Sequence, residues 1–296
     1  MTTIDDNAAS RYAARVDAVL AQRTRLRGPQ PPGDLFAGLP SGHPLLTADP
    51  RRPLDPNLEI IASYIEADDV IIDVGGGAGR ISLPLSLRCR EVINIEPSLA
   101  MATGFRANAA QAGIANARVI EGDWLEVDPP VGTVALVNHV TYLTREITQF
   151  VNKLELAGRR RVLITVNSPP PPSWQRVLFQ LVYEEVEEVV PGHVELANVL
   201  WEQGILPDIR VLPLPAVRPI PAPAREAAIA ARVAGFGGDQ WARWPLGSDL
   251  ECRLRSVLEA RFDELFASGA KGFVPRFITP GREILITWQP MTENGD

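Results

Sequence analysis

The sequence predicts an α/β fold in which a mostly parallel sheet carries helices on both faces. From residue 70 onward, short aliphatic runs alternate with segments of helical spacing, which is typical of parallel strands joined by helices. The first aliphatic run, residues 70–74, leads directly into a cluster of glycines. In open sheets of this kind, ligands bind beyond the carboxyl ends of the strands, so the loops that follow the strands are expected to form the site.

Each element has its own sequence signal. An amphipathic helix is expected over residues 8–26, and a stretch rich in proline and glycine follows, from Gly28 to Pro56, which is not expected to form regular structure. A short helix near residues 58–65 leads into the core. Further strands are expected at residues 92–96, 118–120, 133–137, 161–166, 209–212 and 282–288, and further helices at 80–88, 98–112, 144–154 and 194–203.

Two segments interrupt the alternation. The first begins with four consecutive prolines, residues 169–172, and continues into a helix that bears Trp174 and Leu178; the second carries a helix expected to run from Leu250 to Leu265. We therefore divide the chain into an N-terminal helix and Pro-rich arm (1–56), a core (57–213 and 282–290) with an insertion at 168–191, and a helical insertion at 214–281.

Composition limits the classes of partner. With 296 residues and 46% hydrophobic residues, the chain can build a substantial core. Its net charge of −7 does not favour nucleic acid or an anionic membrane as a partner. Cys89 and Cys252 form neither a metal-binding spacing nor a disulfide framework, so no metal is expected. No apolar run approaches the ~18 residues needed to cross a bilayer, and residues 1–10 do not resemble a signal peptide, so a cytoplasmic location is expected.

The glycine cluster at residues 73–79 follows the first strand and opens the next helix. Glycines there let the backbone approach a ligand closely, and the N–H groups at a helix N-terminus attract an anion. The order is D-x-G-x-G-x-G, whereas a dinucleotide fingerprint counted from Gly75 would need a glycine where Arg80 stands. This disfavours a nicotinamide-dependent oxidoreductase. Glu96, at the end of the second strand, can hold the ribose hydroxyls of either kind of nucleotide.

The segment 73–79 resembles motif I of the class I methyltransferases, which have a Rossmann-like seven-strand fold and use S-adenosylmethionine. The resemblance covers residues 68–167 well and 192–213 loosely. It implies that Glu96 binds the ribose, that Met101 packs on the adenine, and that Asp123 accepts the adenine amino group, while residues 138–140 pass under the methionine end. The expected cofactor-binding residues are Asp73, Gly75, Gly76, Gly77, Gly79, Glu96, Pro97, Met101, Gly122, Asp123, Trp124, Asn138 and His139.

Methyl transfer requires a nucleophile aligned behind the methyl group of a sulfonium, so positioning supplies much of the catalysis. His139 is the candidate general base because imidazole titrates near neutrality and the residue follows the fourth strand; alternatively it only shapes the cofactor pocket. Tyr142 is the second candidate; it could orient the acceptor or equally pack against its neighbours. The (Asp/Asn/Ser)-Pro-Pro-aromatic motif of nucleobase amino methyltransferases is absent from residues 138–141, and Ser168-Pro169-Pro170 follows the fifth strand instead.

We therefore expect an S-adenosylmethionine-dependent methyltransferase that acts on a small molecule or a protein side chain. The alternative is a protein of the same fold that binds the cofactor but serves as a partner or regulatory subunit. The insertion at 168–191 leaves the fifth strand at the ligand-binding edge, so it is expected to stand over the methyl group as a lid. The same helix could instead form a homodimer interface, and the 28–56 arm could also reach the site.

Overall fold

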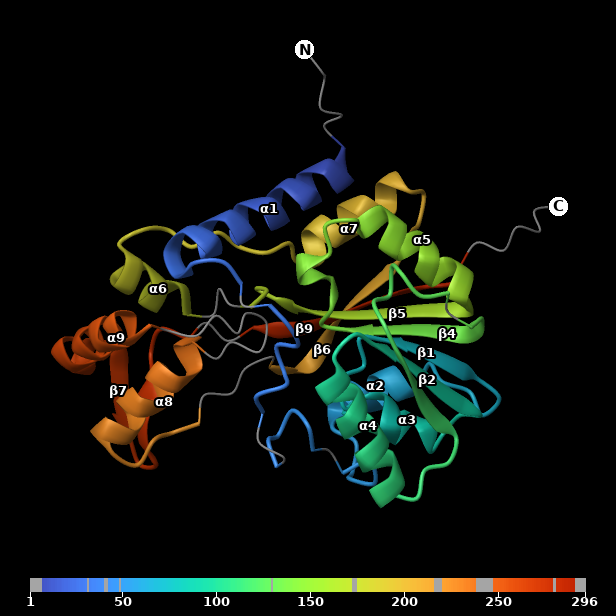
Figure 1. The fold of residues 1–296 in the computed structure, drawn as a ribbon, viewed down its shortest axis with the longest axis horizontal. Coiled ribbons are helices and arrows are strands. Elements are labelled where there is room, and N and C mark those ends of the chain that lie inside the picture. The colour runs from blue at the N-terminus through green and yellow to red at the C-terminus, as the bar shows by residue number, and fades with distance from the viewer. Residues whose placement is uncertain are drawn as a thin grey trace, which may run out of the picture.

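A computed structural model describes residues 7–30, 32–39, 42–47, 49–128, 130–171, 175–215, 220–237, 247–278 and 281–290. The main sheet consists of β1 (Val70–Val74), β2 (Glu91–Glu96), β3 (Ala117–Glu121), β4 (Gly132–Asn138), β5 (Gly158–Ser168), β6 (Asp208–Pro215) and β9 (Arg282–Trp288). Their order is β3-β2-β1-β4-β5-β9-β6 (Figure 1). β9 is antiparallel to both of its neighbours, and the remaining pairs are parallel. The predicted seven-strand, mostly parallel sheet is confirmed.

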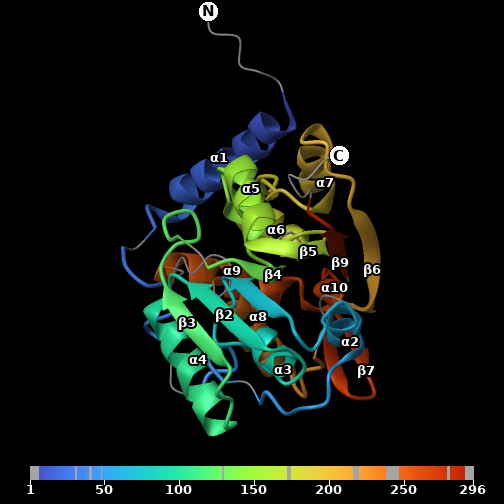
Figure 2. The ribbon, with the colours of Figure 1, turned by 90° about the vertical axis from the view of Figure 1, so that its right-hand side faces the viewer.

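Helices cover both faces of this sheet (Figures 1 and 2). One face carries α5 (Ile147–Ala157) and α7 (His193–Glu202), with α1 (Ala8–Arg27) lying across them. The other face carries α2 (Pro56–Ala62), α3 (Ser82–Ser86) and α4 (Leu99–Gln111). Because both faces are covered, the central strands are aliphatic without alternation, and every residue of β1 is buried.

The N-terminal helix packs as part of the first face. Its buried positions Tyr12, Val16 and Val19 recur at helical spacing, as the sequence predicts, and all three are at most 1% exposed. The Tyr12 hydroxyl donates to the backbone carbonyl of Thr141 at 2.7 Å. Thr141 begins a short 3-10 helix, η1 (Thr141–Leu143), directly after β4. α1 therefore supports the loop that follows β4.

The two insertions pack against each other to form a satellite unit, at the left of Figure 1. It contains α6 (Arg176–Tyr183), α8 (Arg225–Gly237), α9 (Ser248–Ala260), α10 (Phe262–Leu265) and the antiparallel pair β7 (Phe266–Gly269) and β8 (Gly272–Pro275). Leu178 and Val182 of the first insertion share one hydrophobic cluster with residues of the second, including Ile229 and Leu258. The two interruptions are thus one structural unit. Trp174 lies outside the described residues.

One predicted element of this unit is wrong. A single helix was expected from Leu250 to Leu265, but α9 ends at Ala260, Leu265 belongs to the short α10, and a β-hairpin follows. Gly272 has φ +114°, a conformation that favours glycine and closes the hairpin turn. The helical spacing of the leucines was real, but the helical region is interrupted after Ala260 and stops at Leu265, because the backbone is extended from Phe266 onward. Among the described residues, no helix is long and apolar enough to cross a membrane.

Candidate functional site

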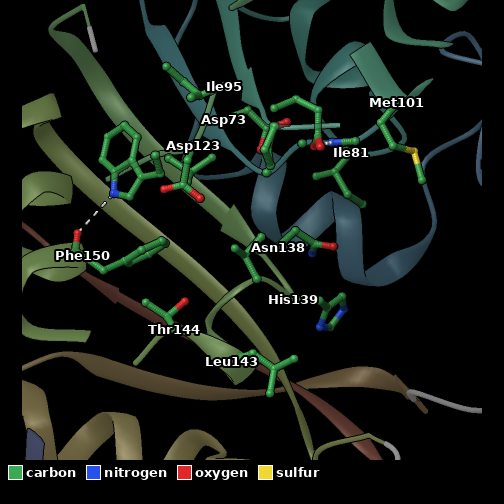
Figure 3. Close-up of a pocket in the computed structure, with 18 of the residues that line it drawn as sticks. Asp73, Ile81, Ile95, Met101, Asp123, Asn138, His139, Leu143, Thr144 and Phe150 are labelled. Carbon is green, nitrogen blue, oxygen red and sulfur yellow. Dashed lines mark hydrogen bonds between the residues drawn. The ribbon is translucent and has the colours of Figure 1, made fainter. Parts of the chain in front are cut away.

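A cavity of about 480 Å³ lies at the carboxyl ends of β1, β2 and β4 (Figure 3). Residues from all three strands and from the loop after β3 line it. All of the predicted cofactor-binding residues contribute to its wall except Gly79 and Gly122. The other predicted residues therefore lie together at one cavity, and their role in binding a cofactor stays a prediction.

The glycines of the 75–77 segment are needed for different reasons. Gly75 has φ +67°, and a Cβ there would stand 2.6 Å from Val140 Cγ2. A Cβ on Gly76 would stand 2.0 Å from Asp73 Oδ2. Gly77 has φ +58°, and a Cβ there would meet only Met101 Sδ, at 3.8 Å. Gly77 is therefore the position at which an added side chain would enter the cavity.

Gly79 and Gly122 are structural. A Cβ on Gly79 would stand 2.5 Å from the Leu83 side chain, and Gly79 has φ +84°. A Cβ on Gly122 would stand 2.3 Å from Val127 Cγ1. Both glycines permit close packing behind the site, so their assignment to the cofactor-binding set does not match their positions outside the cavity wall.

Asp73 is a fully buried carboxylate in the cavity wall. Its exposure is 0%, and neither carboxylate oxygen forms a hydrogen bond of good geometry with a described residue. Burial raises the pKa of Asp73 to about 7, helped by the charge of Glu96 and opposed by the Ser82 hydroxyl. A buried carboxylate with so little compensation is costly, so this position is suited to a ligand that brings a cationic or N–H donor group.

Glu96 is buried at the end of β2 and shapes the loop next to it. Its Oε2 accepts from the Gly77 N–H at 2.9 Å, and its Oε1 accepts from the Ser98 N–H at 2.8 Å. Burial raises the pKa of Glu96, these two hydrogen bonds lower it, and the charge of Asp34 raises it. Each oxygen keeps a lone pair for a further donor, as two neighbouring hydroxyl groups would supply.

The part of the cavity beyond β2 and β3 combines a flat apolar wall with one exposed acid. Met101 is 6% exposed and lines the cavity at the start of α4. Asp123 is exposed there, and its Oδ1 accepts from the Leu125 N–H at 2.8 Å. Trp124 packs edge-to-face on Phe150, with ring centroids 6.2 Å apart. Such a slot fits an aromatic base with an exocyclic amino group.

The Pro-rich arm closes this end of the cavity, which the sequence left open as a possibility. Phe36 and Leu45 line the cavity. The arm is fastened by Asp34, which accepts from the Ser98 hydroxyl at 2.8 Å and from the Ala100 N–H at 3.0 Å. Asp34 thereby joins the arm to the N-terminus of α4. The sequence feature that could have indicated this contact is Asp-Leu-Phe, residues 34–36, within a stretch rich in proline and glycine.

His139 lies at the opposite end of the cavity, immediately after β4. Its φ of +60° is unusual for a residue with a side chain, and such strain is frequent at functional sites. Its Nε2 lies 2.7 Å from Glu283 Oε1, and its Nδ1 lies 3.2 Å from the Tyr142 hydroxyl oxygen. Glu283, at the start of β9, was not among the predicted site residues.

Tyr142 is 2% exposed and does not line the cavity. Its hydroxyl oxygen accepts from the Asn167 N–H at 2.6 Å, and burial raises its pKa. Of the two roles left open for Tyr142, packing agrees with this position, whereas direct contact with an acceptor does not, because the side chain is buried and lies outside the cavity wall. It contacts His139 instead.

The insertion at 168–191 does not form the expected lid within the described residues. None of its described side chains lines the cavity, and α6 packs into the satellite unit with α9. The apolar side of α6 is occupied by Ile229 and Leu258, among others. The alternative role in a homodimer stays a prediction.

Comparison with known proteins agrees with this geometry. A protein-family model described as a methyltransferase domain matches residues 71–156. Among curated proteins, the 23S rRNA (uracil(1939)-C(5))-methyltransferases RlmD of Aeromonas hydrophila (40% identity over 68 residues, 22% of this chain) and Aeromonas salmonicida (31% over 116 residues, 33% of this chain) are similar. The matches span only 16% and 26% of those relatives.

Solved structures support the fold. A methyltransferase-like protein from Bacillus halodurans has a TM-score of 0.53 at 12% identity, covering 79% of this chain and 97% of that one. The YcgJ protein of Bacillus subtilis has a TM-score of 0.50 at 16% identity, covering 78% and 96%. The core is an α/β sheet of the Rossmann-like class with a nucleotide-type loop after its first strand. More particularly, residues 71–156 of this core are similar to a methyltransferase domain, of the class I kind that depends on S-adenosylmethionine.

Proposed function

We propose that this protein transfers a methyl group from S-adenosylmethionine to a small molecule. The observation that carries the cofactor assignment is Asp73, a fully buried carboxylate that faces the cavity and forms no hydrogen bond of good geometry with a described residue, the Ser82 hydroxyl opposing its burial only in part. S-adenosylmethionine would place its ammonium group there and so satisfy a costly buried acid. A nicotinamide dinucleotide would bring phosphates to the same carboxylate, which is unfavourable.

The other cavity residues fit the rest of this cofactor. Glu96 would accept from the two ribose hydroxyls, and Asp123 would accept from the adenine amino group while Met101 packs on the adenine face. When bound, the cofactor supplies an electrophilic methyl group on its sulfonium. The protein supplies alignment and exclusion of water, because the arm covers one end of the cavity and the loop after β4 covers the other.

The acceptor end of the cavity supports a small, partly apolar molecule. Ile81, Val140 and Leu143 line it together with Arg80 and His139. A cavity of about 480 Å³ that also holds the cofactor leaves room for a small group rather than a large one. A protein side chain inserted from outside is the alternative acceptor of similar size.

The rRNA specificity of the similar Aeromonas enzymes is a second candidate, favoured by those matches alone. Uracil C5 becomes nucleophilic only after a nucleophile, such as a thiolate, adds to C6. Cys89 is buried in the cluster on the far face of the sheet, and Cys252 lies on α9; neither lines the cavity. Because neither cysteine lines the cavity, we favour the small molecule.

Two measurements test the proposal. Calorimetry should show that S-adenosylmethionine and its demethylated product bind, and that NAD does not. Turnover, followed as formation of the demethylated product, should then appear with one class of a panel of metabolites and not with ribosomal RNA. Methylation of RNA would replace the proposed acceptor. Tight cofactor binding with turnover only in the presence of a partner protein would favour the regulatory alternative.

A further inference from the structure

β6 is the outermost strand at one end of the seven-strand sheet (Figure 2). Among the described strands it pairs only with β9, so its other side presents backbone N–H and C=O groups that no described strand covers. Ile209 is 42% exposed and Val211 is 59% exposed, although both are β-branched residues that favour half-buried positions in sheets. This open edge therefore combines backbone hydrogen-bonding groups with exposed apolar side chains.

The strand at the other end of the sheet, β3, is different. Arg118 of β3 pairs with Glu91 of β2 at 2.9 Å, and Glu121 pairs with Arg106 of α4 at 2.7 Å. The aliphatic residues of β3 are half-buried, and none of them is exposed. The charges of β3 are thus satisfied within the chain.

The charged side chains of β6 have no such partners. Asp208 and Arg210 are both exposed, and neither forms a salt bridge or a side-chain hydrogen bond with a described residue. They lie two residues apart in one strand, so their side chains stand on the same face of the sheet. Opposite charges on either side of Ile209 are the arrangement that a strand needs to pair with a copy of itself.

Antiparallel pairing of two such strands about a two-fold axis has a defined register. When the axis passes through Ile209, Asp208 of each copy lies opposite Arg210 of the partner subunit. Opposite charges directly across a ladder stabilise it, and like charges destabilise it. An axis through Arg210 would instead set two arginines against each other. Charge therefore selects the register centred on Ile209.

The same register brings the exposed apolar side chains together. Ile209 lies opposite Ile209 of the partner subunit, with Val211 as its diagonal neighbour. Pro207 and Pro213 flank this segment and cannot donate a backbone N–H, so the ladder stays short. Because each copy presents the same strand edge to the other, the association closes at two copies and does not grow into a fibre.

We propose that the outer edge of β6 is a homodimer interface, at which two copies of this chain pair antiparallel about Ile209 and join their sheets into one. The apolar side of α6, the other candidate interface, is already occupied within the chain by Ile229 and Leu258. The β6 edge lies outside the cavity wall, so this inference does not depend on the proposed function.

Sedimentation equilibrium of the full chain, with charge exchange, tests the register. The wild type should dimerise in a concentration-dependent manner. Asp208→Arg and Arg210→Asp, each alone, oppose like charges and should raise the dimer dissociation constant at least about tenfold, because each dimer holds two such contacts. The double variant Asp208→Arg/Arg210→Asp restores opposite charges. Its dissociation constant should return to within about threefold of the wild-type value.

A matched pair of lysine substitutions separates the β6 edge from α6. Ile209→Lys places two ammonium groups at the two-fold axis and should abolish the dimer. Val177→Lys, at a position of α6 with a similar exposure of 49%, should leave the dimer unchanged. Both substitutions are at exposed positions, and circular dichroism should show that both variants fold as the wild type does.

Hydrogen exchange measures the strand pairing itself. The backbone amides of residues 208–211 should gain protection as the protein concentration is raised through the dissociation constant, whereas those of β3 should not change. A wild type that stays monomeric up to about 1 mM would overturn the proposal. A dimer that Val177→Lys dissociates, or one that the double charge exchange fails to restore, would overturn it as well.

Discussion

Asp73 should make the stability of the ligand-free protein depend on pH. Its pKa is about 7 in the folded chain against an ordinary value of 3.8, so the folded state binds more protons than the unfolded state between these values. Its stabilising contribution is complete below about pH 4 and is lost as the pH rises through 7. We expect Asp73→Asn, which cannot ionise, to have a higher Tm than the wild type at pH 8 and to lose this advantage near pH 4.

Thermal unfolding of both proteins across that range checks the prediction. Parallel Tm curves for the wild type and Asp73→Asn would mean that the folded protein does not hold a proton on this carboxyl. Proton release on cofactor binding is a second measurement. Near pH 6 the wild type should release protons when the cofactor binds, and Asp73→Asn should not. Buffers of different ionisation enthalpy reveal such a release in calorimetry.

Gly76 and Gly77 offer a matched pair of substitutions. Gly76→Ala would force a methyl group against Asp73 and Asn94, so we expect a loss of about 1–3 kcal/mol in the free energy of unfolding. Gly77→Ala meets no such obstacle and should cost only about 1–2 kcal/mol through its positive φ. Its methyl group enters the cavity, however. Relative to the stability that each variant loses, the affinity for S-adenosylmethionine should therefore fall more in Gly77→Ala than in Gly76→Ala. Denaturant titration and calorimetry together give both quantities; equal effects in both variants would refute the distinction.

The residues of the site differ in whether the sequence around each of them is enough to predict that it belongs to the site. Asp73, Glu96 and Asp123 lie at or just beyond the carboxyl ends of three successive strands, so their convergence could be predicted from the order of elements alone. Glu283 could not, because it is brought to His139 by β9, which inserts between β5 and β6 although it comes last among the strands. Gly79 and Gly122 matched a motif, and only the neighbouring side chains show that they serve packing.

At the scale of elements, the arm is the part of the site that sequence patterns describe least. It has no helix or strand within its described residues, yet its contacts with α4 are specific. The β7–β8 hairpin is a similar case, because its Gly269 and Gly272 are visible in the sequence but the preceding leucines suggested a longer helix. In both segments tertiary contacts, rather than periodicity, select the conformation.

Asp34→Ala should therefore loosen the arm over the bound cofactor. Removing the carboxylate deletes its bonds to the Ser98 hydroxyl and the Ala100 N–H, and leaves those donors without this partner. We expect S-adenosylmethionine to bind about tenfold more weakly, mainly through faster dissociation, which corresponds to one charged hydrogen bond. Stopped-flow displacement measures the dissociation rate. Asp49→Ala, in a turn of the same arm, serves as the control because its Oδ1 accepts from the Arg51 N–H and it does not line the cavity.

At the scale of the whole molecule, the satellite unit should respond as one body. Leu258 is fully buried in its cluster, so Leu258→Ala is expected to cost about 2–5 kcal/mol. Because the cluster joins both insertions, hydrogen exchange should accelerate in residues 176–183 as well as in 225–237 and 247–275, while residues 70–128 and 130–166 keep their protection. Acceleration confined to the second insertion would show that the two segments are independent.

The position of β9 has a consequence for how the chain reaches this fold. It leaves the ribosome after β5 and β6, but it lies between these two strands and pairs with both. During synthesis β1 to β5 can assemble early, whereas β6 has no neighbour in the sheet until residues 282–288 emerge. These distant pairings carry a large loop-closure entropy and make the last step of folding slow. Nascent chains stalled before residue 282 should thus hold a protease-sensitive segment after β5 and an incomplete His139 environment.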